Sequence, residues 1–177
     1  GLLPVQVAFV SAAVAMLLTN LLTLEEAYES VDWSVIILLG AMLPVGEALE
    51  VSGGADLVAR QVLNLTTHLS PIMTLAIVLV GTMFLSDLIN NAAAAVLMAP
   101  IAATVASGLQ ASPDPFLMCV AIGASCAFLT PIGHQSNTLV MGPGGYHFGD
   151  YWRMGLLLEV ILVLVTVPTI ALFWPLY

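Results

Sequence analysis

Two short polar interruptions inside otherwise apolar sequence hold the side chains best suited to chemistry. The first is Ser86-Asp87-Leu88-Ile89-Asn90-Asn91, and the second is Thr130-Pro131-Ile132-Gly133-His134-Gln135-Ser136-Asn137-Thr138. An unpaired backbone group or amide is costly in lipid, so such breaks persist only inside protein or beside a water-filled cavity. Broken helices at membrane depth are how many transporters hold ions. The two breaks therefore point first to the binding of a solute.

The first break combines amide side chains with the expected start of a helix. Asn90 and Asn91 precede four consecutive alanines. Asn is a favoured N-cap residue, and its side-chain carbonyl can instead face a cation. The free N–H groups and the positive end of the following helix dipole suit an anion. This break predicts oxygen ligands for a cation such as sodium and donors for an oxyanion, with plain capping of a helical hairpin as the alternative.

The second break repeats this chemistry. Pro131 and Gly133 stop a helix, and Ser136, Asn137 and Thr138 bring hydroxyl and amide groups to the expected start of the next one. Unwinding also frees backbone carbonyls. Hydroxyl, amide and carbonyl oxygens without a carboxylate match a monovalent cation better than calcium or a transition metal.

Three ionisable residues lie within or beside the apolar segments. Asp87 could bind the coupling cation, carry a proton or pair with a donor outside this chain; capping or exposure to water is the alternative. His134 could titrate near neutral pH or donate to an anion, or play a structural role. Glu159 is expected to pair with another group or face a cavity.

The composition is that of an integral membrane protein. The chain is 60% hydrophobic and 7% charged, whereas a soluble domain carries roughly 25% charged residues. The net charge of −9, with Arg60 and Arg153 as the two cations, argues against a nucleic-acid partner. Ser136 and His134 lack the further groups of a hydrolase, and no phosphate loop or HExxH pattern is present, so we expect neither an enzyme nor a cofactor.

The hydropathy pattern predicts an all-α fold. The predicted elements are a span over 4–22, a span over 32–50, an interfacial helix over 55–69, a re-entrant hairpin over 71–109, a discontinuous helix over 115–142 and a span over 151–174. The hairpin is predicted to be re-entrant because its arms are short for full spans; two ordinary spans joined by a buried turn are the alternative. Because hydrophobic sequence begins almost at Gly1, we expect a piece of a longer polypeptide, or else a processed terminus.

The second break, followed by Gly142-Pro143-Gly144-Gly145-Tyr146, resembles the second signature of the divalent anion/sodium symporter family. The likeness is greatest to its prokaryotic and algal sulfate-transporter-like branch, whose members often carry cytosolic TrkA-C domains between two membrane halves. Asn90-Asn91-Ala92 through Pro100 resembles the family's hairpin signature, which usually reads Ser-Asn-Thr. The segment from Asp32-Trp33 to Gly53 resembles the helix that precedes the hairpin.

This resemblance implies that the chain is the C-terminal half of an inverted-repeat transporter of a prokaryotic inner membrane. The N-terminal half would belong to the same protein, and the whole transporter would be a homodimer. By that analogy, one sodium site is lined by Asn91, Gly133 and Asn137. The substrate oxyanion lies near Asn90, Asn91, His134, Gln135, Ser136 and Asn137. Asn90 and Ala92 replace the family's Ser and Thr. His134 and Gln135 replace the Thr-Pro of the dicarboxylate carriers, so a dicarboxylate substrate does not carry over.

The sequence thus predicts a secondary active transporter that moves a small divalent oxyanion with sodium by alternating access. Sulfate is favoured as the substrate, and a dicarboxylate is the alternative. A proton-coupled carrier or antiporter of the same superfamily, using Asp87 or His134, is the second hypothesis. A non-transporting membrane assembly subunit is the third.

Overall fold

Every regular element among the described residues is a helix, which confirms the all-α prediction. The computed structural model describes residues 4–31, 33–66, 68–131 and 133–177. Asp32, at the expected start of the second span, and Ile132, in the second break, lie outside the described residues. The helices are α1 (Val5–Leu18), α2 (Leu24–Glu29), α3 (Trp33–Val51), α4 (Gly54–Leu65), α5 (Pro71–Leu88), α6 (Asn91–Gly108), α7 (Pro113–Ala124), α8 (Gln135–Met141), η1 (Phe148–Asp150) and α9 (Tyr151–Phe173).

The chain divides into two compact units, Gly1–Ile37 and Leu38–Tyr177. In the first unit, α2 begins with a capping box. The Thr23 hydroxyl accepts from the backbone N–H of Glu26, whose carboxylate in turn accepts from the backbone N–H of Thr23. This arrangement satisfies two N–H groups that a helix start would otherwise leave without a partner. The rings of Tyr28 and Trp33 stack, with centroids 6.1 Å apart.

In the second unit, α5 and α6 form the predicted hairpin. Ser70 caps α5 and Pro71 occupies its first turn, where a missing N–H costs nothing. The hairpin turns at Ile89 and Asn90, whose backbones are both extended, and Asn90 caps α6. Each helix has 18 residues, about 27 Å of rise, which is long enough to cross a membrane. These lengths suit a re-entrant hairpin and a pair of spans equally, and the re-entrant form stays a prediction.

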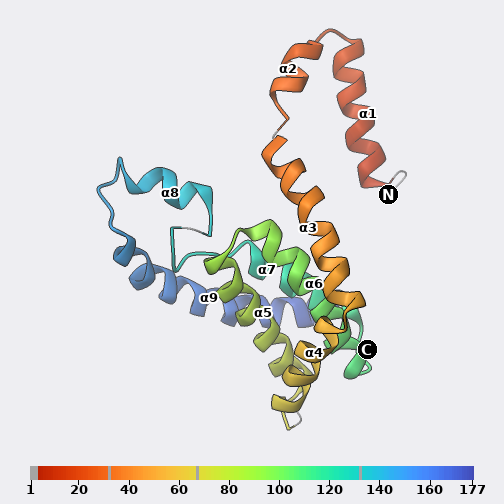
Figure 1. The fold of residues 1–177 in the computed structure, drawn as a ribbon, viewed down its shortest axis with the longest axis vertical. Coiled ribbons are helices and arrows are strands. Elements are labelled where there is room, and N and C mark those ends of the chain that lie inside the picture. Colours follow the sequence, from red (N-terminus) through yellow and green to blue (C-terminus); the bar gives the residue numbers. More distant parts are fainter. Residues whose placement is uncertain (1–3, 32, 67, 132) are drawn as a thin grey trace. The chain divides into compact units, whose positions relative to one another are not determined.

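Helix α7 is in contact with α5, α6 and α9 and forms the centre of the second unit (Figure 1). Its close approach to α5 depends on Gly123, where a Cβ atom would lie only 3.0 Å from the carbonyl oxygen of Leu79. Helix α4 packs on α6, burying Ala55 and Ala59 while its opposite face stays exposed. These contacts hold the ends of α5 and α7 side by side.

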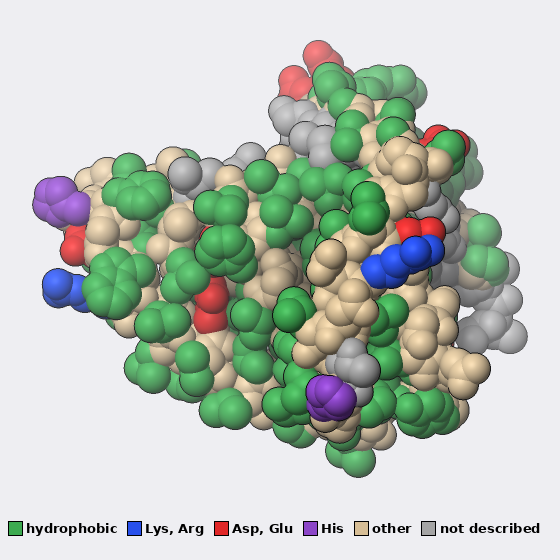
Figure 2. All heavy atoms as spheres, turned by 60° about the horizontal axis from the view of Figure 1, so that its bottom comes forward, with side chains coloured by type: hydrophobic (Ala, Val, Ile, Leu, Met, Phe, Trp, Pro, Cys, Tyr) green, Lys and Arg blue, Asp and Glu red, His purple; other side chains and the backbone are tan. Residues whose placement is uncertain are grey.

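Much of the apolar surface faces outward. Among the described residues, three segments are long and apolar enough to span a membrane, namely Pro71–Leu88, Asn91–Gly108 and Phe148–Phe173. Figure 2 shows a face on which hydrophobic side chains predominate and charged ones are scattered. Exposed apolar surface on this scale is stable only against lipid or another protein, so the chain is a membrane protein.

Candidate functional site

The candidate site lies where the second break meets the tip of the α5–α6 hairpin. Between the end of α7 at Ala124 and the start of α8 at Gln135, the described residues leave the helical conformation. Backbone carbonyls of the break are thereby free to accept bonds from side chains, and the Thr138 hydroxyl donates to the carbonyl of Pro131 at 2.7 Å. In the other direction, the Thr130 hydroxyl of the break donates to the carbonyl of Asp87 at 2.6 Å. The second bond joins the break directly to the end of α5.

Three oxygen atoms from three segments converge on the amide of Asn91, and we call the four groups together the Asn91 cluster. With its nitrogen facing the other three, the amide donates to Gly133 O at 2.7 Å, Ser86 Oγ at 2.9 Å and Ala124 O at 3.0 Å. The Ser86 hydroxyl donates to Ala124 O at 2.6 Å. Ser86 and Ala124 are almost completely buried. With the amide turned by half a rotation, its oxygen accepts from the Ser86 hydroxyl at 2.9 Å and faces the two backbone carbonyl oxygens, which a cation could bridge.

Gly133 allows the break to reach this cluster. A Cβ atom at this position would collide with the side chain of Ala127, and it would lie 2.8 Å from the carbonyl oxygen of Ser86. One of these obstacles is backbone, which cannot rotate away. The glycine is therefore required by close approach, because any side chain would hold the carbonyl of Gly133 away from Asn91.

Asn137 has a different set of partners from Asn91. Its amide nitrogen donates to Ala127 O at 3.0 Å and to Thr130 O at 3.3 Å, and its backbone carbonyl accepts from the Tyr151 hydroxyl at 2.6 Å. Of the three residues predicted to line a sodium site, the structure brings Asn91 and Gly133 together. It places the side chain of Asn137 on the carbonyls of the break itself.

The predicted substrate residues lie at the two helix starts. Asn90 is exposed and accepts from the backbone N–H of Ala93 at 2.8 Å. His134 is exposed and caps α8, its Nδ1 accepting from the N–H of Ser136 at 3.1 Å. Ser136 is also exposed, and the side chain of Gln135 lies outside the described atoms. These groups thus remain open to a solute while Asn91 is engaged in the cluster.

Asp87, at the end of α5, is 2% exposed. Its Oδ1 accepts from the backbone N–H of Leu129 at 2.9 Å, while its buried Oδ2 has no hydrogen-bond partner among the described residues. The sequence alternative of a water-exposed tip residue does not fit this burial. Asp87 instead connects α5 to the break.

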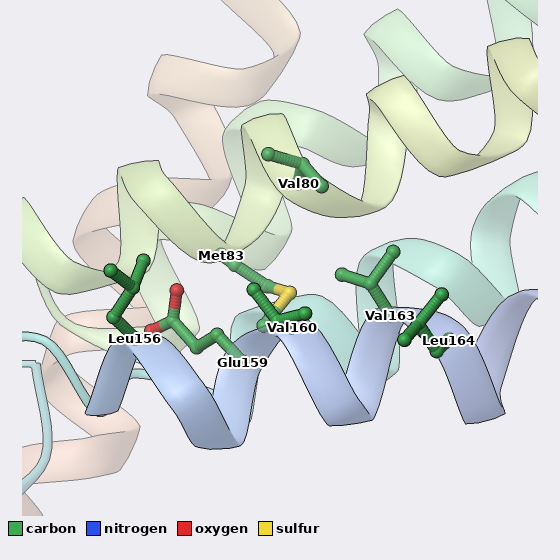
Figure 3. Close-up of a pocket in the computed structure, with 7 residues that line it drawn as sticks. All are labelled: Val80, Met83, Leu156, Glu159, Val160, Val163 and Leu164. Atoms are coloured by element: carbon green, nitrogen blue, oxygen red, sulfur yellow. The ribbon is translucent and has the colours of Figure 1, made fainter. Parts of the chain in front are cut away.

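Glu159 on α9 binds the neighbouring amide of the same break. Its Oε1 accepts from the N–H of Phe128 at 3.3 Å. Gly155, one turn earlier, makes this contact possible, because a Cβ there would collide with the carbonyl of Phe128. Glu159 also lines a cavity of about 230 Å³ between α5 and α9, whose other walls are apolar (Figure 3). The sequence expectation that Glu159 pairs with another group or faces a cavity is met on both counts.

A larger cavity, of about 640 Å³, lies beside the break and the start of α9. Asn137 and Arg153 are among its lining residues, together with Tyr146, Asp150 and Tyr151. Sequence reasoning assigned no role to Arg153 here, nor to Ser86 in the Asn91 cluster. Ser86 lies inside the first polar break, so its position was visible, but its partner Ala124 is 38 residues away in the chain.

Comparison with known proteins identifies the family. The family model described as "Citrate transporter" matches residues 1–115. This chain belongs to the citrate transporter family. The family assignment agrees with transport rather than catalysis, and it confirms the motif resemblance at the level of the ion transporter superfamily. The TrkA-C branch and the C-terminal-half assignment stay predictions.

Three relatives indicate the range of proteins that this citrate transporter family member resembles. It is 39% identical to an uncharacterized transporter of Synechocystis over 93% of this chain and 27% of that protein. It is 30% identical to sodium/sulfate cotransporter 2 of Chlamydomonas reinhardtii over 89% of the chain and 18% of the relative. It is 26% identical to the sodium-dependent dicarboxylate transporter SdcS of Staphylococcus saprophyticus over 85% of this chain and 29% of that protein. The chain spans less than a third of each relative's length.

Proposed function

We propose that the chain forms part of a secondary active transporter that moves a small divalent oxyanion together with sodium by alternating access. The Asn91 cluster is the observation that carries this proposal. It places a hydroxyl and two backbone carbonyls within about 3 Å of the amide nitrogen of Asn91, at the meeting point of two broken helices. Sulfate is the favoured substrate and a dicarboxylate is the alternative; relatives named for each are known.

The ligand chemistry of the cluster favours sodium. Its four groups are neutral oxygen donors, and the cluster contains no carboxylate, thiolate or imidazole. Hard, uncharged oxygens suit a monovalent cation, whereas calcium sites include carboxylates and transition-metal sites use nitrogen or sulfur. We propose that the amide of Asn91 points its nitrogen inward when no ion is bound. It then turns its oxygen inward to ligate sodium with Ser86 Oγ, Ala124 O and Gly133 O.

Asn137 supports this site from the opposite end of the break. Because its nitrogen holds the carbonyls of Ala127 and Thr130, its amide fixes the path of the backbone that carries Gly133. We propose that Asn137 contributes to the sodium site in this way and through its own amide oxygen, as the family resemblance implies. Loss of either asparagine should therefore impair sodium binding.

The substrate is proposed to lie on the exposed side of the two helix starts. Asn90, His134 and Ser136 offer hydrogen-bonding groups there, and Gln135 is included because the family resemblance implies it. The cavity beside Asn137 also includes Arg153, a positive charge suited to an oxyanion. We propose that the remainder of the substrate cage and a second sodium site come from an N-terminal half of the same transporter, in a homodimer of the prokaryotic inner membrane.

Uptake of labelled sulfate by proteoliposomes containing the whole gene product tests the proposal. We expect uptake that requires an inward sodium gradient and is lost in Asn91→Ala and Asn137→Ala. Gln61→Ala is the matched control, since it removes an exposed amide on α4. Succinate and citrate measured in the same assay identify the substrate. Normal sodium-dependent uptake by both asparagine variants would refute the site, and absence of uptake of any of these anions would favour a non-transporting subunit.

Proton coupling is the second candidate, favoured by the burial of Asp87 and its free Oδ2. The variant Asp87→Asn separates the two mechanisms, because Asn keeps the acceptor for Leu129 but cannot release a proton. Sodium-driven uptake should survive this change if sodium is the coupling ion. Loss of all coupling, together with uptake driven by a pH gradient in the parent protein, would favour proton coupling.

A further inference from the structure

The cavity of about 640 Å³ beside the start of α9 has a lining that changes from polar to apolar along the helix. Asp150, Tyr151 and Arg153 line it at the start of α9, and Met154 and Leu158 line it further along. Its volume lies within the range of about 300–1,000 Å³ that is typical of small-molecule sites. A ligand that matches this lining is charged at one end and apolar at the other.

The polar end of the cavity lies at the boundary of the membrane. Helix α9 has 23 residues, which rise about 34 Å, only slightly more than the thickness of roughly 30 Å of a hydrocarbon core. The exposed ring of Trp152 lies at one end of the helix and Trp174 lies just beyond the other, as aromatic residues do at the two membrane–water interfaces. Arg153 therefore lies at the depth of the lipid phosphates.

The two charges of the cavity do not neutralise each other. Arg153 forms no ion pair with a carboxylate among the described residues, and its guanidinium carbon lies 6.0 Å from the centroid of the Trp152 ring. Asp150, three residues earlier, turns Oδ2 towards His147 instead, where it accepts from the backbone N–H at 2.8 Å and lies 3.6 Å from Nδ1. The cavity thus presents one cation and one anion about a helical turn apart.

We propose that this cavity binds a zwitterionic phospholipid. Its phosphate accepts hydrogen bonds from Arg153, its ammonium group pairs with Asp150, and an acyl chain lies along Met154 and Leu158. An anionic head group would leave the charge of Asp150 without a partner. A free oxyanion such as sulfate shares the chemistry of the phosphate but has no chain to cover the apolar lining. The site goes beyond the proposed transport of an anion and depends on neither the substrate nor the coupling ion.

Native mass spectrometry of the whole gene product measures this binding without any measurement of transport. The purified protein is freed of lipid in detergent and mixed with equal amounts of dioleoyl phosphatidylethanolamine, which is zwitterionic, and dioleoyl phosphatidylglycerol, which is anionic. We expect the parent protein to retain the zwitterionic lipid in preference, and an excess of sodium sulfate should not displace it. This comparison uses the unmodified protein, so it remains informative if a variant misfolds.

Two charge variants assign the retained lipid to this cavity. Arg153→Gln should weaken retention roughly tenfold or more, as expected for the loss of a charge-assisted hydrogen bond. Arg60→Gln is the matched control, because it removes an exposed arginine on α4. Asp150→Asn keeps an acceptor for the N–H of His147 but removes the negative charge, so it should shift the preference towards the anionic lipid.

A pair of neighbouring residues on α8 tests the apolar part of the site. Val140→Trp should abolish retention because Val140 lines the cavity, whereas Leu139→Trp should not, because Leu139 is exposed and is not part of the lining. Equal retention by Arg153→Gln and the parent protein, or a preference of the parent protein for the anionic lipid, would overturn the proposal. Displacement of the lipid by sulfate would overturn it as well and would assign Arg153 to a free oxyanion. Failure of sodium-dependent uptake would leave all of these results unchanged.

Discussion

The substitution Gly133→Ala tests the Asn91 cluster most directly, because it perturbs one ligand without removing a polar group. The new methyl group would collide with the side chain of Ala127, and it would lie 2.8 Å from the carbonyl oxygen of Ser86, against an ordinary contact of at least 3.4 Å. The backbone of the break must therefore retreat by about 0.6 Å. A shift of this size is enough to weaken the bond of 2.7 Å between Gly133 O and the amide of Asn91, since hydrogen bonds of this kind span only 2.7 to about 3.2 Å.

The energetic cost follows from the same displacement. Overpacking of a closely packed site costs about 1–3 kcal/mol, and the cluster shares in this loss because one of the two obstacles is the backbone carbonyl of Ser86 at the end of α5. If this energy is taken from ion binding, the apparent affinity for sodium should fall roughly 5- to 150-fold. Replacing glycine also stabilises the folded state by about 0.4–1 kcal/mol through the unfolded chain, so overall stability should change less than affinity.

The assay is the unfolding temperature as a function of sodium chloride, with choline chloride holding the ionic strength constant. A ligand that binds the folded state raises this temperature in proportion to its occupancy. The half-saturating sodium concentration should rise in Gly133→Ala and stay unchanged in Gly142→Ala, whose new methyl group meets nothing within 4 Å. Equal sodium dependence in Gly133→Ala and the parent protein, or equal impairment in Gly142→Ala, would refute the proposed cluster.

Three further predictions concern other contacts. Ser86→Ala removes the hydroxyl bonded to Ala124 O and should weaken sodium dependence by roughly fivefold, or about 1 kcal/mol, whereas the exposed control Ser107→Ala should not. Gly155→Ala should lower stability by about 1–3 kcal/mol in thermal unfolding because its methyl group meets the backbone of the break, and Gly81→Ala, with no neighbour within 4 Å, should not. Two hydrogen bonds to the Glu26 carboxylate lower its pKa, and the bond from the backbone N–H of Thr23 has a larger effect than the bond from the Thr23 hydroxyl. The start of α2 should therefore be most stable above the ordinary pKa of Glu and should fray as the pH falls through the lowered value. NMR titration of Glu26 in Thr23→Ala should show the pKa returning partway, since the backbone bond remains.

Local signals in the sequence located both breaks and most of the helices. Asn90 before an alanine run predicts a helix start, and α6 does begin at Asn91 with Asn90 as its cap. Pro131 and Gly133 predict a break, and the chain is not helical there. Continuous apolar stretches predict membrane helices, and the predicted span over 151–174 corresponds to one of three segments of suitable length among the described residues, the other two being the arms of the hairpin. The predicted span over 4–22 contains α1, which has 14 residues. Each of these features depends on a few neighbouring residues, so the sequence alone is sufficient for it.

The partners of the polar groups could not be predicted in this way. Ser86 looked like one of several polar residues in a break, and its role depends on Ala124 O, which α7 brings to the end of α5. The sequence predicts that Asn137 and Asn91 line one sodium site, but it carries no sign that the nitrogen of Asn137 donates to the carbonyls of Ala127 and Thr130. A carbonyl oxygen is present in every residue, so sequence carries no information about which carbonyl will be freed and turned towards a side chain.

The sequence by itself determined that this chain is a membrane protein with two polar helix breaks, because hydropathy, caps, proline and glycine act over one or two turns. The tertiary structure decided which oxygens surround Asn91 and that Glu159 and Asp87 bind consecutive amides of the second break. Both outcomes depend on how closely helices approach, and the glycines at 123, 133 and 155 set those approaches only in combination with the backbone that faces them. Contact between distant segments is a property of the packed molecule, and no local pattern specifies it.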